Sequence, residues 1–300
     1  MASSTYHTPV LLRESIDGLD IKADGVYVDV TFGGGGHSRE IVKQLKNGTL
    51  FGFDQDAEAE KNKINDERFF FISQNFRYLK KFLKLNGVNS VDGILADLGV
   101  SSYQIDTAER GFSTRFEGPL DMRMDRSLTT TAATILNTYE EKELVRVFSN
   151  YGEVRNSKTL ASAIVTERRV TKLRTIADLK NILERTAMGN VNRYAAQVFQ
   201  ALRIEVNHEM EALQDFLKQS LEVLKPGGRL VVISYHSLED RLVKDFMRSG
   251  NFTGEVEKDY FGNQAKYFRL ITKKPIAAAE GEVSLNNRSR SARLRIAEKL

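Results

Sequence analysis

The stretch Asp29-Val-Thr-Phe-Gly-Gly-Gly-Gly-His-Ser38 decides the fold, because four glycines join a short apolar run to a helical pattern. The run Gly25–Phe32 is rich in β-branched and aromatic residues and predicts a strand. Residues 38–46 follow with their apolar side chains at helical spacing. Glycines at such a junction let the backbone approach a ligand that a β-carbon would exclude. The stretch therefore predicts a strand–turn–helix unit suited to holding a nucleotide-type ligand.

The strand signal recurs on the carboxyl side of this unit and alternates with helical patterns. Three further apolar runs within the first hundred residues predict strands at Thr49–Phe53, Phe69–Ile72 and Val91–Leu95. Strands separated by helices predict an α/β fold, with a parallel sheet and helices on both faces.

The alternation stops at about Asp106, and helical periodicity dominates as far as Arg203, as in Glu140–Phe148, Ser157–Glu167 and Ala177–Arg185. The α/β pattern then returns as a helix near Glu209–Leu224, a turn at Lys225–Gly228, and strands at Arg229–Ser234 and Lys266–Thr272. We therefore expect a discontinuous α/β domain, residues 1–108 and 206–300. An inserted all-helical domain, residues 109–205, would interrupt it.

Composition excludes several kinds of site. The 300 residues contain no cysteine, which excludes disulfides, thiolate zinc sites and cysteine nucleophiles. The four histidines show no metal-ligand spacing, so we expect no metal. No apolar run is long enough to span a membrane, and Met1–Val10 lacks the apolar core of a secretory signal. These features predict a cytoplasmic protein without a membrane partner.

Basic residues are concentrated in two stretches, although the net charge is only +4. Residues 155–193 hold nine Lys or Arg against three Asp or Glu, and residues 286–300 hold five against one. Such stretches are either solvated helix faces or contacts for nucleic-acid phosphates.

A second acid sharpens the interpretation of the glycine turn. Asp54 ends the next predicted strand, 21 residues after Gly33, where a carboxylate can accept hydrogen bonds from ribose hydroxyls. A dinucleotide fingerprint would place a third glycine where Ser38 stands. An acid four residues before the first glycine, as Asp29 is, is typical of S-adenosylmethionine-dependent methyltransferases. We therefore favour a methyl donor as cofactor over a nicotinamide dinucleotide.

Asp97 follows the fourth predicted strand, in Ala96-Asp-Leu-Gly-Val-Ser-Ser102. Ligands of open α/β sheets bind at the carboxyl ends of strands, so Asp97 is the candidate catalytic residue. A carboxylate that accepts the N–H of an exocyclic amine would orient its nitrogen and relieve positive charge during transfer. The alternative is an aspartate that caps the following turn.

Several longer motifs closely resemble the RsmH (MraW) family over His7 to Leu300. They are Asp29–Ser38, Asp97–Ser102, Glu109–Ser113, Gly118–Asp125, Phe199–Asn207, Ser234–Arg241 and Arg288–Arg295. The resemblance implies a Rossmann-like class I methyltransferase that uses S-adenosyl-L-methionine. It also implies methylation of the exocyclic 4-amino group of one cytosine in the decoding region of 16S rRNA. Its partner would be the assembled small ribosomal subunit.

The resemblance also implies cofactor contacts. The glycine loop would contribute Gly33, Gly35, Gly36 and His37, and Asp54 would bind the ribose. Phe76 would lie beside the adenine, unless it is a core aromatic. Asp97 and Gln104 would lie nearer the methionine end. One departure is Tyr103, where the family usually has proline.

Three residues are candidates for contact with the target base or its RNA. Tyr235, like Tyr103, could stack on an unstacked base, or be buried. His236 could line the base pocket or cap the next helix, for which Ser237 with Asp240 also forms a candidate capping box. Arg123 could touch RNA, or pair with the neighbouring aspartates and order its loop.

Two other functions stay open at this point. A nicotinamide-dependent oxidoreductase would share the glycine turn, and a non-catalytic ribosome-assembly factor would share the fold. With no cysteine to attack a ring carbon, a methyltransferase of this sequence would use direct in-line transfer. Homodimerisation is compatible with the sequence but not indicated by any particular residue.

Overall fold

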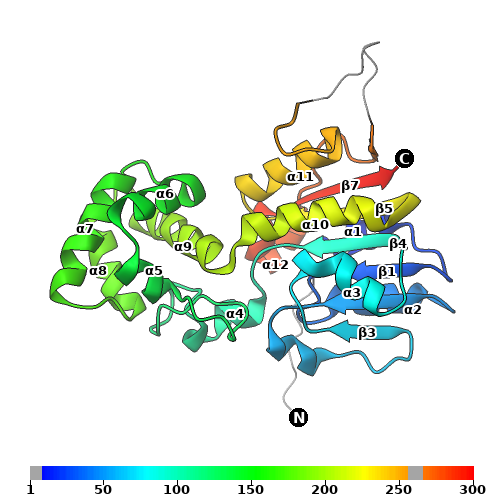
Figure 1. Cartoon of the computed structure of the whole chain (residues 1–300), viewed down its shortest axis with the longest axis horizontal. Helices are drawn as coiled ribbons and strands as arrows, with labels where there is room; N and C mark the ends of the chain where they lie inside the picture. The colour runs from blue at the N-terminus through cyan, green and yellow to red at the C-terminus, as the bar shows by residue number, and fades with distance from the viewer. Residues whose placement is uncertain (1–8, 256–265) are drawn as a thin grey trace. The chain divides into compact units, whose positions relative to one another are not determined.

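A computed structural model describes residues 9–255 and 266–300 and divides the chain into two compact units. The α/β unit comprises the chain up to Gly99 together with Met210–Leu300, and the helical unit comprises Val100–Glu209. Figure 1 shows the sheet of the first unit and the helix cluster of the second. The helical unit is thus an insertion between two segments of the α/β unit.

The α/β unit is built on a seven-stranded sheet with the order β3-β2-β1-β4-β5-β7-β6. Neighbouring strands from β3 to β5 are parallel, whereas β7 is antiparallel to both β5 and β6. The strands are β1 (Val26–Asp29), β2 (Thr49–Phe53), β3 (Phe69–Ile72), β4 (Val91–Asp97), β5 (Leu224–Ser234), β6 (Phe268–Leu270) and β7 (Arg293–Lys299). The predicted α/β class is therefore confirmed, and β7 alone among these strands runs opposite to the others.

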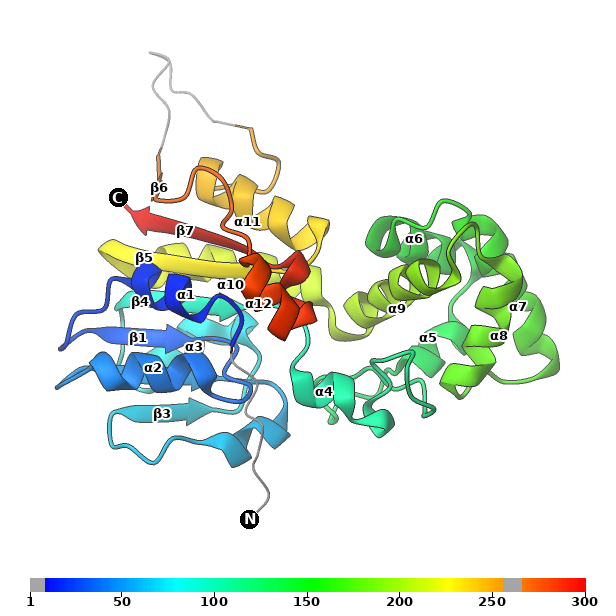
Figure 2. The same cartoon turned by 180° about the vertical axis from the view of Figure 1, so that it is seen from behind.

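Helices cover both faces of this sheet, and the strand residues alternate between them. Ile94 and Ala96 of β4 pack into one core with helices α3 (Leu79–Leu85), α10 (Glu209–Val223) and α11 (Ser237–Ser249). Leu95 packs into the other core with α1 (Leu12–Leu19) and α2 (Gly36–Gln44). This period of two is what a strand buried on both faces requires. Figure 2 shows α1 and α2 in front of the sheet, with α10 behind it.

Strand β5 contains the turn that the sequence predicts at residues 225–228. Leu224 pairs with Val91, but the next pair is Arg229 with Gly93, so the register shifts between them. Gly227 in the intervening segment has φ +79°, a left-handed conformation that favours glycine. The segment is a bulge that lets β5 continue in register as far as Ile233, opposite Asp97.

The carboxyl-terminal segment differs from the sequence-based expectation. The strand expected at Lys266–Thr272 is shorter, Phe268–Leu270, and the basic tail proposed for phosphate contacts forms β7 instead. Arg295 is only 8% exposed, and its guanidinium donates to both carboxylate oxygens of Asp240 at 2.7 and 2.9 Å. Residues 293–299 of the tail therefore belong to the sheet, where Arg295 pairs with Asp240, and phosphate contact by the other basic residues of the tail stays a prediction.

The helical unit has its own core, to which Leu144, Ile164, Leu179 and Val198 contribute from different helices. Side-chain caps start several of its helices; Thr131 and Thr175, for example, each accept a backbone N–H three residues on. Its helices are α4 (Ser102–Asp106), α5 (Ala132–Thr138), α6 (Glu141–Gly152), α7 (Ser157–Val170), α8 (Ile176–Thr186) and α9 (Val191–Asn207). The remaining short elements of the chain are η1 (Ala57–Asn62), η2 (Phe76–Tyr78), η3 (Ala108–Arg110), α12 (Glu280–Leu285) and η4 (Asn287–Ser291).

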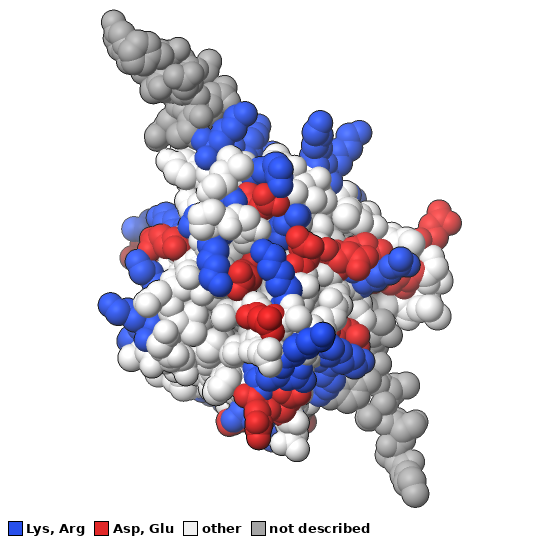
Figure 3. All heavy atoms as spheres, turned by 90° about the vertical axis from the view of Figure 1, so that its right-hand side faces the viewer, with Lys and Arg blue, Asp and Glu red and all other residues white. Residues whose placement is uncertain are grey.

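The described helices and one face of the surface show how apolar and charged residues are distributed. Among the described residues, no helix has the length and apolar character needed to cross a membrane. Figure 3 shows one face of the molecule, on which Lys and Arg are interspersed with Asp and Glu rather than gathered into one basic field. This face does not have the uniform positive charge that a nucleic-acid surface usually has.

Candidate functional site

The glycine loop between β1 and α2 is shaped for a ligand on one side and for packing on the other. Gly33 and Gly35 have φ +50° and +73°, left-handed values that disfavour a side chain. A β-carbon on Gly34 would meet nothing within 4 Å, whereas one on Gly36 would lie 2.2 Å from Pro9 Cγ. The loop is therefore open at Gly34, and Gly36 is a glycine because Pro9 packs against it.

Asp54, directly after β2, anchors this loop. Its Oδ2 accepts the N–H of Gly33 and its Oδ1 accepts the N–H of Asp56, both at 2.8 Å. The side chain of Asn62 donates to the carbonyl of Gly33 at 3.0 Å. Burial raises the pKa of Asp54 to about 6. Each carboxylate oxygen keeps a second acceptor position, so Asp54 can still accept a hydroxyl hydrogen bond.

Asp29, the last residue of β1, holds the loop from the other end. Its Oδ1 accepts the N–H of Thr31 at 3.1 Å, and its Oδ2 accepts the hydroxyl of Ser38 at 2.7 Å. Burial raises its pKa, and the nearby His37 and these hydrogen bonds oppose the rise. Asp29 is fully buried, so it ties the strand to the helix and does not face a ligand.

Asp97 is the last residue of β4, and its two carboxylate oxygens have different surroundings. Its N–H donates to Thr31 Oγ1 at 2.6 Å, and its Oδ1 accepts the hydroxyl of Tyr235 at 2.7 Å. The other oxygen, Oδ2, lies 3.9 Å from Nδ1 of His37, and the side chain is 23% exposed. Burial raises the pKa of Asp97 to about 6, although His37 and Tyr235 oppose the rise. Oδ2 is therefore a negatively charged acceptor that a ligand can reach.

His37 lies behind Asp97, in the first turn of α2. Its Nε2 is 3.1 Å from the carbonyl oxygen of Val10, which can only accept, so Nε2 carries a proton. This leaves Nδ1 facing Asp97. The ring is buried, so within the glycine motif only the backbone of His37 is available to a ligand.

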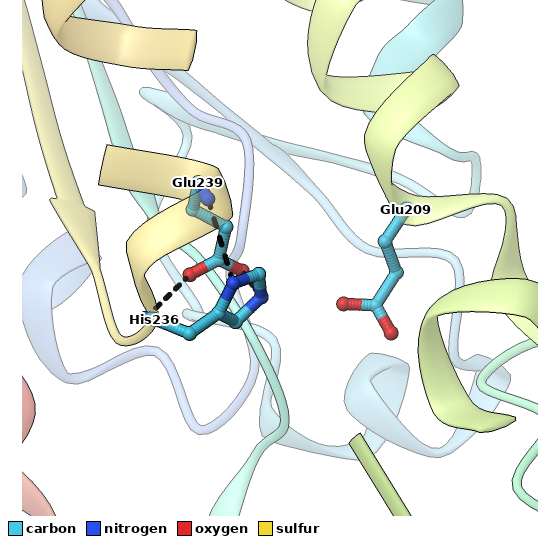
Figure 4. A group of neighbouring side chains, drawn as sticks. All are labelled: Glu209, His236 and Glu239. Carbon is cyan, nitrogen blue, oxygen red and sulfur yellow. Dashed lines mark hydrogen bonds and ion pairs between the residues drawn. The ribbon is translucent and has the colours of Figure 1, made fainter. Parts of the chain in front are cut away.

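Tyr235 and His236 follow β5, whose carboxyl end lies beside that of β4. The hydroxyl bond to Asp97 draws the pKa of Tyr235 upward, after the larger effect of burial. His236 is the N-cap of α11, and its Nδ1 accepts the N–H of Glu239 at 3.4 Å (Figure 4). The capping pair expected at Ser237 and Asp240 is therefore wrong by one residue, and Asp240 binds Arg295 instead.

Glu239 is a buried residue of this site that sequence reasoning missed. Its Oε2 accepts the N–H groups of both Tyr235 and His236. The signal was the spacing of His236 and Glu239, which matches a capping box with histidine as N-cap. Glu209, also drawn in Figure 4, belongs to the helical unit, where its carboxylate accepts two hydrogen bonds from Arg203, each at 2.8 Å.

Phe76 begins η2, just after β3, on the same sheet edge as Asp54. It is half-buried and meets Phe216 of α10 edge to face, with ring centroids 5.5 Å apart. The packing assigns it to the rim of the core, and its partial exposure leaves ring surface for an adenine.

Gln104 and Arg123 lie in the helical unit. Gln104 is buried, and its Oε1 accepts the N–H of Ser101 as part of the capping box of α4. Arg123 donates to both oxygens of Asp121, at 2.7 and 2.8 Å, and to the carbonyl of Arg126 at 3.1 Å. Of the two roles that the sequence allows for Arg123, the structure shows the ordering of its own loop.

The site as a whole fits S-adenosylmethionine better than a dinucleotide. Asp54 and Asp97 place carboxylates at the carboxyl ends of β2 and β4, where they suit ribose hydroxyls and cationic groups. A ribose acceptor such as Asp54 is common to both kinds of ligand, whereas the Asp97 carboxylate suits a cationic group and would repel a nearby pyrophosphate. The open side at Gly34 leaves space for a ligand beside the loop. The acceptor carboxylates and the space beside Gly34 both agree with a cationic adenosyl compound.

Residues 4–300 match the MraW methylase family, and the chain belongs to that family. It is 58% identical over 297 residues to "Ribosomal RNA small subunit methyltransferase H" of Cytophaga hutchinsonii, covering 98% of this chain and 99% of the relative. A relative of the same name from Bacteroides thetaiotaomicron is 56% identical and covers 98% of each chain. The predicted RsmH (MraW) family is thereby confirmed.

The solved structures that match the chain are more distant in sequence than these relatives. An rRNA methylase from Streptococcus thermophilus matches with a TM-score of 0.43 and 11% identity, over 96% of this chain and 95% of its own. A methyltransferase from Streptococcus mutans in complex with SAH matches with a TM-score of 0.43 and 13% identity, over 96% and 97%.

Proposed function

We propose that this chain methylates small-subunit ribosomal RNA with S-adenosyl-L-methionine as the methyl donor. We further propose that the acceptor is the exocyclic 4-amino group of one cytosine in the decoding region of 16S rRNA. Membership of the methylase family and the names of its relatives support an rRNA methyltransferase. The choice of an amino group as acceptor depends on the geometry around Asp97.

The observation that carries this choice is the state of the Asp97 carboxylate. Tyr235 holds Oδ1, and Oδ2 faces His37 only at 3.9 Å, so Oδ2 can accept a further N–H. An exocyclic amine is a weak nucleophile because its lone pair is delocalised into the ring. A carboxylate that accepts one N–H turns the nitrogen towards the methyl donor and stabilises the positive charge that develops.

The residues of the chain bind and orient the reactants rather than react with them. S-adenosylmethionine, when bound, supplies an activated methyl group. The glycine loop and Asp54 would hold its adenosine part, and Asp97 would orient the amine for in-line transfer. With a pKa of about 6, Asp97 is mostly ionised at pH 7, as an N–H acceptor must be. Water takes up the amine proton after transfer. The chain has no cysteine for a covalent intermediate.

Recognition of the RNA would involve both units. A base within folded RNA must be unstacked before it can enter a pocket, and Tyr235, His236 or Tyr103 could contact it. Tyr103 is 51% exposed and available for stacking. The helical unit, with its basic residues, would contact RNA phosphates, and Arg123 would order the loop at its start. Such a reaction belongs to the cytoplasm, on assembled small subunits, whether the enzyme acts as a monomer or as a homodimer.

The test is methyl transfer from labelled S-adenosylmethionine to purified small subunits that lack the modification. Free 16S rRNA and DNA serve as parallel acceptors. We expect label in the RNA of the subunits and little on DNA. Label on no RNA, despite cofactor binding, would contradict the proposal and favour the assembly-factor alternative.

Cofactor choice is tested separately by thermal unfolding. A ligand that binds only the folded chain raises its melting temperature, by an amount that grows with the logarithm of its concentration relative to its Kd. We expect S-adenosylhomocysteine to raise the melting temperature and NAD to leave it unchanged. A rise with NAD alone would return the nicotinamide-dependent oxidoreductase as the better explanation.

A further inference from the structure

We propose that Glu239 is a positioning residue for methyl transfer. Its carboxylate fixes the backbone of Tyr235, whose hydroxyl in turn holds Asp97 with Oδ2 free for the substrate amine. The role in transfer rests on the proposed function, whereas the mechanical link from Glu239 to the Tyr235 ring does not. Glu239 touches neither the reacting amine nor the cofactor in this scheme, so it acts only through Tyr235.

The carboxylate of Glu239 is almost completely buried and accepts two backbone N–H groups of the segment that follows β5. Glu239 is 2% exposed. Its Oε2 accepts the N–H of Tyr235 at 2.8 Å and that of His236 at 3.4 Å. Its Oε1 lies 3.1 Å from Nε2 of His236, at an angle that does not make a hydrogen bond. A buried carboxylate is costly unless backbone donors satisfy it, so the segment and Glu239 are mutually constrained.

The capping box of α11 accounts for only part of this arrangement. In a capping box, the N3 carboxylate bonds the N–H of the N-cap residue. Here the N-cap is His236, but the shorter bond goes to Tyr235, the residue before it. The return bond, from Glu239 N–H to His236 Nδ1, is long at 3.4 Å. The carboxylate therefore holds Tyr235 more firmly than it caps α11.

Tyr235 is consequently held at both ends. Glu239 fixes its backbone nitrogen, and Asp97 accepts its hydroxyl at 2.7 Å. Asp97 in turn has its own N–H bonded to Thr31. If the anchor at Glu239 is lost, the ring and the carboxylate that it holds can shift together. A displacement of about 1 Å near a reacting group can reduce a rate by roughly a hundredfold.

The test separates reach from charge at position 239. Gln keeps the length and an acceptor oxygen, whereas Asp keeps the charge but is too short to reach Tyr235 N. We expect Glu239→Gln to keep kcat within about threefold of the parent, and Glu239→Ala and Glu239→Asp to lose about ten- to a hundredfold. KM for S-adenosylmethionine should change little in all three, because the glycine loop and Asp54 are untouched.

A double-variant cycle tests whether Glu239 acts through Tyr235. We expect Tyr235→Phe and Glu239→Ala together to be little worse than the more severe single change. Asp92→Ala is the matched control, because it removes another carboxylate that accepts a backbone N–H in the same unit, that of Val26 at 2.9 Å. This control should lower the melting temperature and keep kcat. Additive losses in the cycle, or a kcat for Glu239→Ala as high as that of the control, would overturn the proposal.

A spectroscopic measurement keeps this proposal separate from the acceptor. The ring signals of Tyr235, assigned in ring-labelled protein by their absence in Tyr235→Phe, report its environment without turnover. We expect them to move towards those of free tyrosine in Glu239→Ala and to stay in place in Glu239→Gln. Unchanged signals in Glu239→Ala would refute the link, even if methyl transfer to RNA is established. If the signals shift in Glu239→Ala but the parent protein transfers no methyl group to RNA, the proposed function is refuted and the link from Glu239 to Tyr235 is not.

Discussion

Strand β4 carries two half-buried aspartates, Asp92 near its start and Asp97 at its end, and their surroundings are opposite. Asp92 Oδ2 accepts the N–H of Val26 at 2.9 Å and the ammonium of Lys225 at 2.7 Å. Burial would raise its pKa, but these partners hold the pKa below its ordinary value. Among the residues that the structure describes, no cation makes a hydrogen bond to the Asp97 carboxylate, and burial raises its pKa to about 6. The two carboxylates lie about 16 Å apart along one strand.

The difference distinguishes a structural acid from a reactive one. Lys225 and the N–H of Val26 stabilise the ionised carboxylate of Asp92, so its charge contributes to the stability of the fold. The fold leaves Asp97 with a charge only partly compensated by Tyr235 and His37, which a ligand donor can complete. Perturbed acids in such positions are typical of functional sites, where stability is lower so that binding or catalysis can occur.

The largest expected effect is the difference in methyl transfer between Asp97→Ala and Asp92→Ala. Removing Asp97 removes the acceptor that orients the amine, and we expect a loss of about a thousandfold or more in kcat. Removing Asp92 should leave kcat within about threefold, because no reacting group lies near it. Single-turnover rates on small subunits, with the affinity for S-adenosylhomocysteine measured in parallel, provide the comparison.

Two outcomes would break this distinction. If Asp97→Ala folds but loses S-adenosylhomocysteine, Asp97 serves the cofactor alone. If Asp92→Ala is as inactive as Asp97→Ala while still folded, the two ends of β4 do not differ in function.

A smaller loss is expected for Tyr235→Phe, which removes the hydroxyl that donates to the Asp97 carboxylate. A hydrogen bond to a charged group is worth about 1.5 to 3 kcal/mol, which corresponds to roughly ten- to a hundredfold in kcat. Affinity for S-adenosylhomocysteine should be unchanged. An unaltered kcat would mean that Asp97 holds its orientation without Tyr235.

The pH dependence of kcat gives a further contrast. Asp97 must be ionised to accept an N–H, and its pKa is about 6. We expect kcat, at saturating cofactor, to fall about tenfold per pH unit below that value. Asp54 also has a pKa of about 6, so its protonation should act on cofactor affinity instead. A kcat that stays flat down to pH 5 would contradict the assignment of Asp97.

The smallest expected effect is on the free energy of unfolding, where Asp97→Asn and Asp92→Asn should act in opposite directions. Because the folded-state pKa of Asp97 lies above its unfolded value, ionised Asp97 disfavours folding, and this penalty is removed as pH falls through about 6. We expect Asp97→Asn to stabilise the chain at pH 7.5 by about 1 to 3 kcal/mol, and less at pH 5.

Asp92 should behave in the reverse way. Its lowered pKa stabilises the folded state above pH 4, and this contribution is lost only as pH falls through the folded-state value. Asp92→Asn should therefore destabilise the chain at both pH 7.5 and pH 5. Urea unfolding at the two pH values tests both variants, and destabilisation of equal size by Asp97→Asn at pH 7.5 would remove the contrast.

Local sequence signals predicted the frame of this site well. Strands β2 and β3 have the predicted bounds, Thr49–Phe53 and Phe69–Ile72, because each is a compact apolar run between polar segments. The glycine turn, too, lies where it was expected. These features depend on residues close together in the chain, which periodicity and turn residues report directly.

Contacts between distant segments were beyond local signals. The bond between Tyr235 and Asp97 joins residues 138 positions apart, and only the adjacency of β4 and β5 brings them together. Strand β7 was not predicted, because its two arginines are typical of a phosphate-binding tail. Only the pairing of Arg295 with Asp240, 55 residues away, lets a charged residue be buried in this strand. Of the two caps that the sequence offered for α11, His236 is confirmed, and the pair Ser237 and Asp240 is wrong.

The most direct test of the account is the chemical position of the transferred methyl group. RNA from small subunits treated with the enzyme and labelled S-adenosylmethionine is digested to nucleosides, which are separated and identified by mass. We predict label in a cytidine methylated at its 4-amino nitrogen, because Asp97 is arranged to orient an N–H donor. Label on a ring carbon or a ribose oxygen would contradict that assignment of Asp97.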